Sequence, residues 1–585
     1  MTENKKHNEQ LFWILLGIII FLGIFARFYM LADRPFHHDE SLNAIYGRYF
    51  YNHPTSQFYK YDPMLHGPFL YNLYPFFYQI LDESKATARL VMALMGSFLI
   101  FLPFMFRRYL NKTTLFLATL FIASSPTLVY WSRFVRHDPP VLICLAMLIM
   151  GWFSKSAWKK SFLWTWGLIL PFTIKENAYV HVAIFLGYLV YEFLLNALLK
   201  LDLETLAGKA WRFCKDHPGK VFVGLISVCF IYVVLYSAWF RHPDGILDGI
   251  YRKSLAYWLN QHHKDRIAGP FIFQFLMLSW YEQVFILMIF LQTAHFYLRR
   301  SFQIRGTFVA LILMSIIAKY LSPLDIPSTS LLSGVLKIKI SLDFYPFILL
   351  LGHSLIMTTV FLVEKKRDLA LTGYLFTSFF FTYSLVGEKV PWLSVYPLFM
   401  GILFLAVYVS KETSLNIDSD RFLKVSAIVL ALFQIRIMIM TNYSRAGADT
   451  EFISQVHTSR DYEKVAFQIR EEIQSPIGHK PLVMAMEHNT WPLTWYLYGL
   501  EQYNYIKGNR ELNEFDYVLT STSDSATGAE LKRTHTRNDV SLRHWWLPDY
   551  KRMTFWNFLN YALHHNPWTP PGKMDISVYK KVTTE

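Results

Sequence analysis

The chain has 585 residues, of which 53% are hydrophobic and 18% aromatic, and it carries a formal net charge of +14. Only 17% of the residues are charged, well below the quarter or so that is usual in soluble domains. This balance indicates an integral membrane protein with a smaller soluble part. We expect no nucleic-acid partner, since no soluble basic module is apparent. The three cysteines lack CxxC spacing, which argues against disulfides and cysteine-bound metal.

Apolar runs recur along the first three quarters of the chain. A helix that crosses a bilayer needs about 20 apolar residues, so the runs predict a mostly α-helical, polytopic membrane protein with about thirteen transmembrane helices. The predicted spans are Leu11–Leu31, Leu90–Phe106, Thr113–Trp131, Pro139–Phe153, Phe162–Ile174, Ala178–Leu198, Val221–Phe240, Pro270–Leu298, Gly306–Leu321, Phe344–Val363, Leu369–Val386, Pro391–Val409 and Phe422–Met440. No small-residue cleavage site follows the first run, which is therefore interpreted as a retained anchor.

The apolar stretch Gly67–Leu81 is shorter and contains prolines, and its placement decides the topology. Lysines and arginines favour the cytoplasmic side of a membrane. If Gly67–Leu81 lies on the outer surface, all the basic clusters fall on one side; if it spans, all but the first move outside. We therefore predict that it is interfacial or re-entrant. The segments then predicted on the outer face are Asp33–Arg89, Arg133–Asp138, Ile174–Asn177, Arg241–Gly269, Ser322–Asp343 and Gly387–Trp392.

A polar tail follows from about Thr441. The predicted organisation is a membrane domain over residues 1–440, with a first outer loop and its interfacial helices at 33–89, and a soluble extracytoplasmic α/β domain over residues 441–585. Within the tail, the predicted strands are Pro481–Glu487, Phe515–Ser521 and Asp575–Val582, while Thr536–Trp546 is predicted as a loop and Met553–His565 as a helix.

The acid pair Asp39 and Glu40 stands at the edge of the first span, in RPFHHDESLNAIYGRY. A solvated pair of loop acids is the simpler interpretation, but acids beside a membrane span are costly to bury and commonly functional. The residues that follow have the pattern of an amphipathic surface helix, whose N-terminal dipole favours a carboxylate. An outward-facing base at a bilayer surface suits a reaction between a lipid-borne donor and an external acceptor.

Two further segments carry candidate residues. In YDPMLHGPFLY, the HGP sequence predicts a bend back toward the membrane, and His66 is either a turn residue or a substrate-binding one. In SPTLVYWSRFVRHD, Asp138 precedes two prolines and follows Arg133 and Arg136. These three residues are either a helix cap with interfacial arginines or a second acid whose basic partners suit a phosphate.

Glutamate and lysine stand side by side in two predicted outer turns. IKEN contains Lys175 and Glu176, and GEKVPW contains Glu388 and Lys389. A buried ion pair explains either one alone. Two such pairs on the outer side of separate hairpins favour a shared role, and lysine is a suitable point charge for a phosphate. We therefore count all four as candidate substrate- or phosphate-binding residues.

Known cofactor motifs are lacking in the sequence. No GxxxxGK[ST], GxGxxG or HExxH pattern occurs, so neither a nucleotide-driven pump nor zincin chemistry is supported. We expect no cofactor. His37 and His38 precede Asp39 directly and leave a divalent metal open as an alternative, although adjacency alone is weak evidence.

Taken together, FHHDES, LHGPFLY, SRFVRHD, IKEN, GEKVPW and the late WPLTWYL (Trp491–Leu497) resemble the membrane glycosyltransferases of the GT-C fold. The pattern is similar to the protein O-mannosyltransferases and lipid A aminoarabinose transferases (family 39 and its kin). It is most similar to a bacterial and archaeal group described as flippase-activity-associated. The sequence departs from this pattern by His37 and His38 and by its outer C-terminal domain, and both departures leave the acceptor open.

The resemblance implies a reaction and a location. Members of the fold take a sugar from a polyprenyl-phosphate carrier at the outer leaflet and transfer it to a protein, lipid or glycan. The implied partners are this donor, such an acceptor and membrane lipids, and the implied location is the cytoplasmic membrane with the active site outside. The catalytic acid maps to Asp39, with Glu40 beside it, and the second acid maps to Asp138. The resemblance implies that basic residues hold the carrier phosphate. The candidates are Arg133, Arg136, Lys175 and Lys389, the last two from their position more than from a motif match.

The implied mechanism is an inverting transfer. Asp39 takes the proton of the acceptor hydroxyl as this attacks the anomeric carbon, and basic residues stabilise the leaving phosphate. Glu40 and Asp138 position acceptor and water or tune Asp39. A flippase or transport accessory for lipid-linked sugars is the alternative, and a binding scaffold is another. A transporter would place its ionisable residues at mid-membrane on broken helices, whereas these acids cluster at one predicted face.

Overall fold

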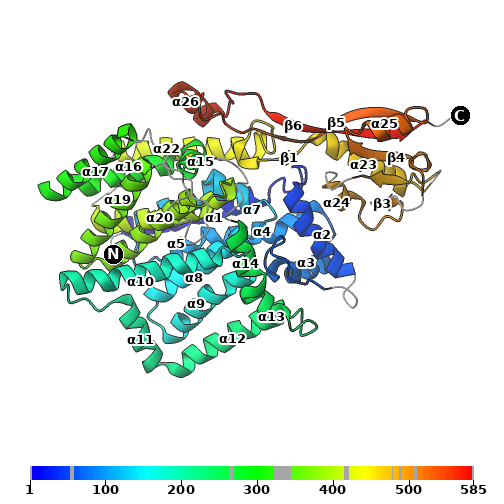
Figure 1. The fold of residues 1–585 in the computed structure, drawn as a ribbon. Coiled ribbons are helices and arrows are strands. Elements are labelled where there is room, and N and C mark those ends of the chain that lie inside the picture. Colours follow the sequence, from blue (N-terminus) through cyan, green and yellow to red (C-terminus); the bar gives the residue numbers. More distant parts are fainter. Residues whose placement is uncertain are drawn as a thin grey trace.

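A computed structural model of the chain describes residues 3–52, 58–261, 269–321, 344–413, 421–476, 479–486, 491–504 and 510–582. Helices make up a large body, and a mixed sheet built from the C-terminal residues projects from one end of it (Figure 1). The predicted outer segment Ser322–Asp343 lies outside the described residues.

The body is formed by helices of very different lengths. They are α1 (Glu3–Phe28), α2 (His38–Asn52), α3 (Phe69–Ile80), α4 (Lys85–Ile100), α5 (Leu102–Met105), α6 (Lys112–Ser124), α7 (Pro126–Ser132), α8 (Asp138–Phe153), α9 (Ala157–Ile169), α10 (Ala178–Leu199), α11 (Leu206–Asp216), α12 (Pro218–Tyr236), α13 (Gly245–Leu247), α14 (Ser254–Gln261), α15 (Phe273–Tyr281), α16 (Gln283–Leu298), α17 (Phe302–Leu321), α19 (Phe344–Val363), α20 (Arg367–Leu385), α21 (Val395–Glu412) and α22 (Arg421–Ile439). Single 3₁₀ or π turns are η1 (Leu170–Thr173), η2 (Asp248–Arg252), η3 (Pro391–Ser394), η4 (Met440–Ser444), η5 (Phe452–Ser454) and η7 (Leu512–Glu514).

Six stretches of the described helices are long and apolar enough to cross a membrane. They are His7–Phe28, Ala178–Leu199, Pro218–Tyr236, Tyr345–Val363, Pro391–Glu412 and Arg421–Ser444. Two bent pairs, α6 with α7 at 54° and α15 with α16 at 115°, raise the number to eight if each counts as one span. The predicted count of about thirteen is not confirmed. Several predicted spans fall on shorter helices, such as α8 with 16 residues and α9 with 13.

The stretch predicted as interfacial forms α3, with 12 residues. A helix of that length is about 18 Å long, well short of the roughly 30 Å hydrocarbon core. It packs against α2, and a Cβ atom at Gly47 on α2 would lie 2.5 Å from the Tyr74 Cβ on α3. Glycine therefore allows the two helices to approach closely, and the interfacial placement of α3 stays a prediction.

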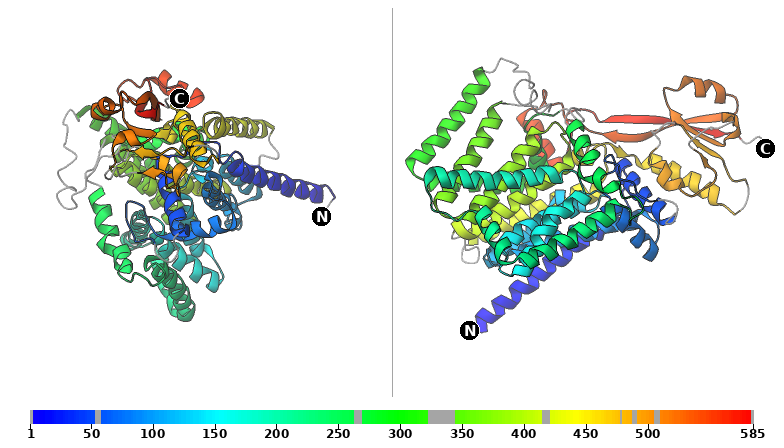
Figure 2. Two further views of the ribbon diagram at one scale, coloured as in Figure 1. Left: turned by 90° about the vertical axis from the view of Figure 1, so that its right-hand side faces the viewer. Right: turned by 60° about the horizontal axis from the view of Figure 1, so that its bottom comes forward.

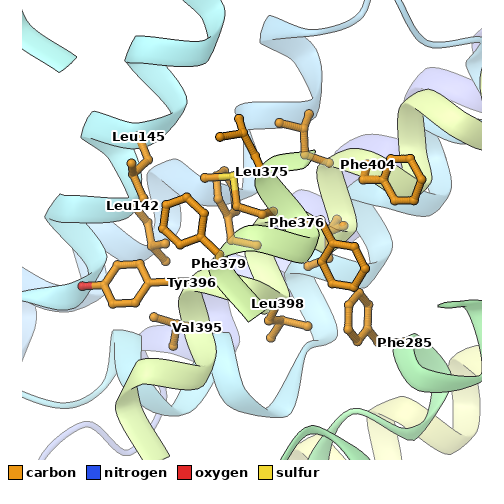
Figure 3. Close-up of a cluster of buried hydrophobic side chains, with 14 of the residues drawn as sticks. Leu142, Leu145, Phe285, Leu375, Phe376, Phe379, Val395, Tyr396, Leu398 and Phe404 are labelled. Carbon is orange, nitrogen blue, oxygen red and sulfur yellow. The ribbon is translucent and has the colours of Figure 1, made fainter. Parts of the chain in front are cut away.

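Aromatic and branched side chains fill the centre of the helical body between α8, α16, α20 and α21 (Figure 3). The rings of Phe376 and Phe404 stack with centroids 6.0 Å apart, and Phe285 meets Phe376 at 6.1 Å. Tyr396 stands at the edge of this cluster, where its hydroxyl donates a hydrogen bond to Asp138 at 2.7 Å. The core therefore supports one of the predicted acids directly.

The C-terminal residues build a six-stranded sheet, which we call the C-terminal sheet, with strand order β1-β5-β6-β4-β2-β3. The strands are β1 (His457–Thr458), β2 (Val483–Ala485), β3 (Tyr503–Asn504), β4 (Tyr517–Ser521), β5 (His535–Trp545) and β6 (Gly572–Lys581). The helices of this region are α23 (Arg460–Gln474), α24 (Leu493–Leu497), α25 (Ser525–Leu531) and α26 (Phe555–His564). Strands were predicted at β2, β4 and β6 and a helix at α26, and these predictions are confirmed.

The loop predicted over Thr536–Trp546 is wrong, because these residues form β5, whose 11 residues make it the longest described strand. Its local sequence is polar, and antiparallel pairing with β6 makes it a strand. The two strands extend as a long ribbon from the sheet back to the helical body (Figure 2). There α26 packs against α15, with the rings of Tyr561 and Trp280 5.2 Å apart. The tail therefore contacts the membrane helices at a point distant from the sheet.

Candidate active site

A cavity of about 450 Å³ lies where the predicted outer segments meet. Each of the segments that contain HHDE, HGP, RFVRHD, IKEN and GEKVPW contributes to its wall. The predicted site residues among those that line it are His37, His38, Asp39, His66, Arg136, Lys175, Glu176 and Glu388. Segments separated by up to about 350 residues in the chain are thus brought together at one place, as the sequence predicted.

Asp39 lies in the first turn of α2 and reaches into this cavity. The helix begins there because the Asp39 backbone N–H donates to Nδ1 of His37 at 3.0 Å, so the histidine ring caps the helix. Arg136 Nη1 lies 2.6 Å from Asp39 Oδ2, and the Asp39 side chain is 35% exposed. Burial raises the pKa of Asp39, but Arg136 together with His37 and His38 lowers it by more, so this pKa lies well below its usual range. Asp39 is therefore ionised at neutral pH.

Asp138 is the fully buried counterpart of Asp39. It is the first residue of α8, and two prolines follow it in the first turn. Proline suits this position because the backbone N–H that it lacks would have no partner within the helix there. Lys175 Nζ lies 2.6 Å from one carboxylate oxygen and Arg136 Nε lies 3.4 Å from the other. Arg136 thus bridges the two acids. We call Asp39, Arg136, Asp138 and Lys175 the cavity cluster.

Arg136 is also fixed by an aromatic ring. Its guanidinium carbon lies 3.7 Å from the ring centroid of Trp392, the last residue of GEKVPW, which lies in η3. Cation–π contacts of this kind are strongest with tryptophan. The stacking holds the arginine between the acids while it leaves some of its N–H donors available to a ligand.

Glu40 points away from the cavity and is fully buried. Arg89 Nη2 and Arg34 Nη2 lie 2.7 Å and 3.1 Å from its carboxylate oxygens. The carboxylate also accepts hydrogen bonds from the backbone N–H groups of His37 and Val135. Burial raises the pKa of Glu40, yet Arg89 and Arg34 lower it by more, so it stays ionised. This saturated carboxylate ties α2 to α4 and to the RFVRHD turn, which is a structural task. We call Glu40, Arg34 and Arg89 the buried cluster.

Two of the basic residues predicted to hold phosphate do not line the cavity. Arg133 donates to the backbone carbonyls of Ala26, Tyr29 and Met30, at the end of the first span. Lys389 is buried and donates to the Ser384 carbonyl. Both side chains hold neighbouring segments in place, while Arg136 and Lys175 face the cavity.

His66 and Glu176 join two segments that form the cavity wall. His66 Nδ1 lies 2.7 Å from Glu176 Oε2, and the Tyr61 hydroxyl donates to Glu176 Oε1 at 2.8 Å. The next residue, Gly67, donates its N–H to the Ile174 carbonyl, and a Cβ there would lie 2.2 Å from the Thr173 carbonyl oxygen. Only glycine allows the HGP turn to rest directly on IKEN. Glu388 also lines the cavity.

Arg543, which no sequence pattern indicated, also reaches the cavity, from β5. Its Nη2 donates to Nδ1 of His38 at 2.9 Å and to the Trp491 carbonyl at 3.1 Å. The register of β5 against β6 shifts between Ser541 and Arg543, and such irregularities redirect side chains. Other lining residues that were not predicted from the sequence are Asn43, His137, Asn177, Tyr257, Tyr383 and Gln455.

Burial lowers the pKa of both His37 and His38 to about 4, so both rings are neutral at pH 7. Each ring already accepts a hydrogen bond at Nδ1, from Asp39 and from Arg543 respectively. No group of three or more His, Cys, Asp or Glu side chains in the described part of the chain is arranged to hold a metal ion. The observed role of these histidines is to fix the start of α2 and its contact with β5.

Comparisons with known proteins bear on the same segments. Residues 65–208 match the model of a family described as dolichyl-phosphate-mannose-protein mannosyltransferase. The match contains His66, Arg136, Asp138 and Lys175, and Asp39 precedes it. The sequence motifs pointed to this same family. A search of curated proteins found no match.

Several solved structures are similar to the chain. ArnT from Cupriavidus metallidurans in the apo state is 12% identical with a TM-score of 0.45, over 98% of both chains. The same protein bound to undecaprenyl phosphate is 12% identical with a TM-score of 0.44, over 98% of both chains. The Archaeoglobus fulgidus oligosaccharyltransferase in the apo form is 11% identical with a TM-score of 0.44, over 83% of this chain and 63% of the other.

Proposed function

We propose that the protein is an inverting glycosyltransferase that moves a sugar from a polyprenyl-phosphate carrier to an acceptor hydroxyl. The observation that carries this proposal is the cavity cluster, in which an ionised and partly exposed carboxylate stands beside two buried cations. The family matched by residues 65–208 supports the donor class, because dolichyl phosphate is a polyprenyl phosphate.

Asp39 is the general base of the proposed reaction. The acceptor oxygen forms a bond to the anomeric carbon while the bond from that carbon to the phosphate oxygen breaks, and the electron pair leaves with the phosphate. The acceptor proton passes to Asp39, which is ionised and faces the cavity. A single displacement of this kind inverts the anomeric configuration. The phosphate needs no proton to leave if cations stabilise its charge.

Arg136 and Lys175 supply that stabilisation. Both are held by Asp138, which lies at 2.6 Å from Lys175 Nζ and 3.4 Å from Arg136 Nε. Fixed cations in a site with little water stabilise developing charge without reorganising during the reaction. A phosphate that accepts hydrogen bonds from Arg136 also weakens the hold of this arginine on Asp39. Donor binding then makes Asp39 a stronger base at the moment when it must accept a proton.

The cavity is proposed to face outward. Glu388 and Trp392 line it between the end of α20 and the start of α21. At the opposite ends of these helices lies a basic cluster made of Arg299, Arg300, Lys366, Arg367 and Lys411. The 19 residues of α20 span about 28 Å, close to the thickness of a hydrocarbon core. The positive-inside rule therefore favours an outer, extracytoplasmic cavity in the cytoplasmic membrane.

One observation favours a second candidate, a transport accessory for lipid-linked sugars. Glu282 is buried at the 115° break between α15 and α16. It accepts hydrogen bonds from the Ser125 hydroxyl and the Thr127 N–H, at the break between α6 and α7. A buried acid on broken helices is typical of transporters. If this site drives the function, Glu282→Gln will stop lipid-linked sugar movement across vesicle membranes while Asp39→Asn leaves it intact.

The test of the transferase uses labelled sugar on undecaprenyl phosphate, supplied to membranes that contain the protein. Wild type is expected to transfer label to an endogenous acceptor and to invert the anomeric configuration, as read by NMR of the released product. Asp39→Asn is expected to reduce transfer by about 100-fold or more. Asp33→Asn is the matched control, since Asp33 pairs with Arg460 at the surface and is not among the residues that line the cavity. Retained configuration, or equal transfer by both variants, would contradict the proposal.

A further inference from the structure

Arg543 brings a positive charge from the C-terminal sheet into the cavity that the predicted outer segments form. Part of the cavity wall is therefore a residue that stands about 500 positions after His38, its hydrogen-bond partner. The contact joins β5 to the first turn of α2, directly beside Asp39.

The charges around Arg543 differ from those around the other cavity cations. Arg136 and Lys175 are each within 3.4 Å of a carboxylate oxygen. Arg543 forms no ion pair within the part of the chain that the structure describes, and its two hydrogen bonds go to a neutral ring and to a backbone carbonyl. Arg543 thus differs from Arg136 and Lys175 in that no described carboxylate forms an ion pair with it.

The guanidinium of Arg543 also has N–H donors that form no hydrogen bond with the described residues. Both hydrogen bonds use Nη2, and Nε is buried without a partner among the described residues. A buried polar nitrogen without an acceptor is costly and calls for an explanation. Arginine is suited to phosphate and carboxylate groups, because its planar fork of N–H donors matches their oxygens.

We propose that Arg543 binds an anionic group, a phosphate or a carboxylate, of a substrate held in the cavity. The C-terminal sheet then completes the substrate site, and its docking on α2 is part of substrate recognition. This inference rests on the proposed function for the existence of a substrate, but its binding test needs no turnover. The anionic group belongs either to the carrier phosphate of the donor or to the acceptor.

The simplest alternative is that Arg543 only holds the tail against α2 through His38 and Trp491. A lysine at position 543 distinguishes anion binding from docking of the tail, because it can supply the charge but not the hydrogen bonds of the guanidinium. Arg543→Lys retains the charge but loses Nη2, the nitrogen that donates to both His38 and Trp491, so it separates anion binding from docking. Arg537→Gln is the matched control, because Arg537 lies on the same strand and pairs with the exposed Asp539.

The experiment uses the full-length protein in detergent and two probes, undecaprenyl phosphate and inorganic phosphate. The dissociation constant of each probe is measured for wild type, Arg543→Gln, Arg543→Lys and Arg537→Gln, and inorganic phosphate is titrated with and without saturating lipid. Thermal melting of every variant shows whether it is folded. Loss of one charge-assisted contact is expected to weaken binding by about 10-fold or more.

If Arg543 holds the carrier phosphate, Arg543→Gln weakens the lipid and Arg543→Lys restores part of the affinity. If Arg543 holds an anionic group of the acceptor, Arg543→Gln leaves the dissociation constant of the lipid unchanged. In the presence of saturating lipid, the same variant then binds inorganic phosphate about 10-fold more weakly than wild type. Unchanged constants for both probes in a folded Arg543→Gln would overturn the inference. A wild type that binds the lipid but transfers no sugar would count against the proposed function and leave this inference standing.

Discussion

Asp39 and Glu40 are neighbours in the chain but belong to two polar regions with opposite properties. Asp39 is 35% exposed in the cavity and has one arginine at 2.6 Å. Glu40 is fully buried and is surrounded by two arginines and two backbone N–H groups. Successive residues of a helix point about 100° apart, so the first turn of α2 directs one acid into the cavity and the other into the protein.

The comparison shows why ionised groups alone do not identify a catalytic site. Both acids have a lowered pKa and both pair with arginine. Only the cavity cluster combines a lowered pKa with access to a ligand. The buried cluster has every oxygen occupied, and its carboxylate has no room to accept a substrate proton. The predictions below separate the two clusters, starting with the largest expected effect.

Glu40→Gln is expected to destabilise the protein more than any other single change considered. The variant leaves the guanidinium groups of Arg34 and Arg89 buried without their carboxylate, and breaking a buried ion pair in this way costs about 3–5 kcal/mol of unfolding free energy. Thermal melting in detergent checks it. Glu83→Gln is the control, because the Glu83–Arg48 pair is partly exposed and is worth about 1 kcal/mol or less. Equal melting temperatures of the two variants would contradict the structural role of Glu40.

Arg136→Met is expected to reduce transfer by about 100-fold, because it removes a cation from the leaving phosphate. It also shifts the pH profile. Asp39 must be ionised, so activity is lost as the pH falls through its pKa. Because Arg136 lowers this pKa, the acid limb of the variant should begin at a higher pH than that of wild type. An acid limb that does not move would show that Asp39 is not the titrating group.

Lys175→Met is expected to reduce transfer by about 10-fold or more, with little change in the acid limb. Lys175 contacts Asp138 and does not contact Asp39. Its loss therefore weakens stabilisation of the leaving phosphate but leaves the pKa of Asp39 nearly unchanged. The measurement is the pH dependence of the transfer rate with saturating donor. A shift of the acid limb as large as that of Arg136→Met would contradict this division of roles.

His66→Ala is expected to have the smallest effect, a few-fold loss of transfer. The His66–Glu176 contact is partly exposed, and such pairs contribute about 1 kcal/mol or less. Gly67→Ala should be much more damaging, because its Cβ would collide with the Thr173 carbonyl. Thermal melting and transfer rates of the two variants check this order, and a reversal would show that His66 contacts the substrate.

The sequence predicted which segments meet but not which side chains face the cavity. HHDE, HGP, RFVRHD, IKEN and GEKVPW converge as expected. Glu40, Arg133 and Lys389 turn away from the cavity because of the local helix and turn geometry, which spacing in the sequence does not encode. The glycine of HGP was the best local signal of a close contact, since it permits the approach to Thr173.

Arg543 was missed for a different reason. β5 becomes a strand by pairing with β6, about 35 residues later in the chain, and its own polar sequence shows no strand pattern. The predicted number of spans is not confirmed, because several predicted spans fall on helices shorter than a full span, such as α8 and α9. Prediction was therefore best where local pattern and packing agree, as in β4 and α26.

The most direct test compares Asp39→Asn and Glu40→Gln side by side, with transfer per folded molecule and melting temperature measured on the same preparations. The account predicts that Asp39→Asn keeps the melting temperature of wild type and loses transfer by about 100-fold or more. It predicts that Glu40→Gln melts at a clearly lower temperature while the folded fraction still transfers sugar. The opposite pattern, or loss of transfer in Glu40→Gln without loss of stability, would contradict the assignment of chemistry to Asp39 and structure to Glu40.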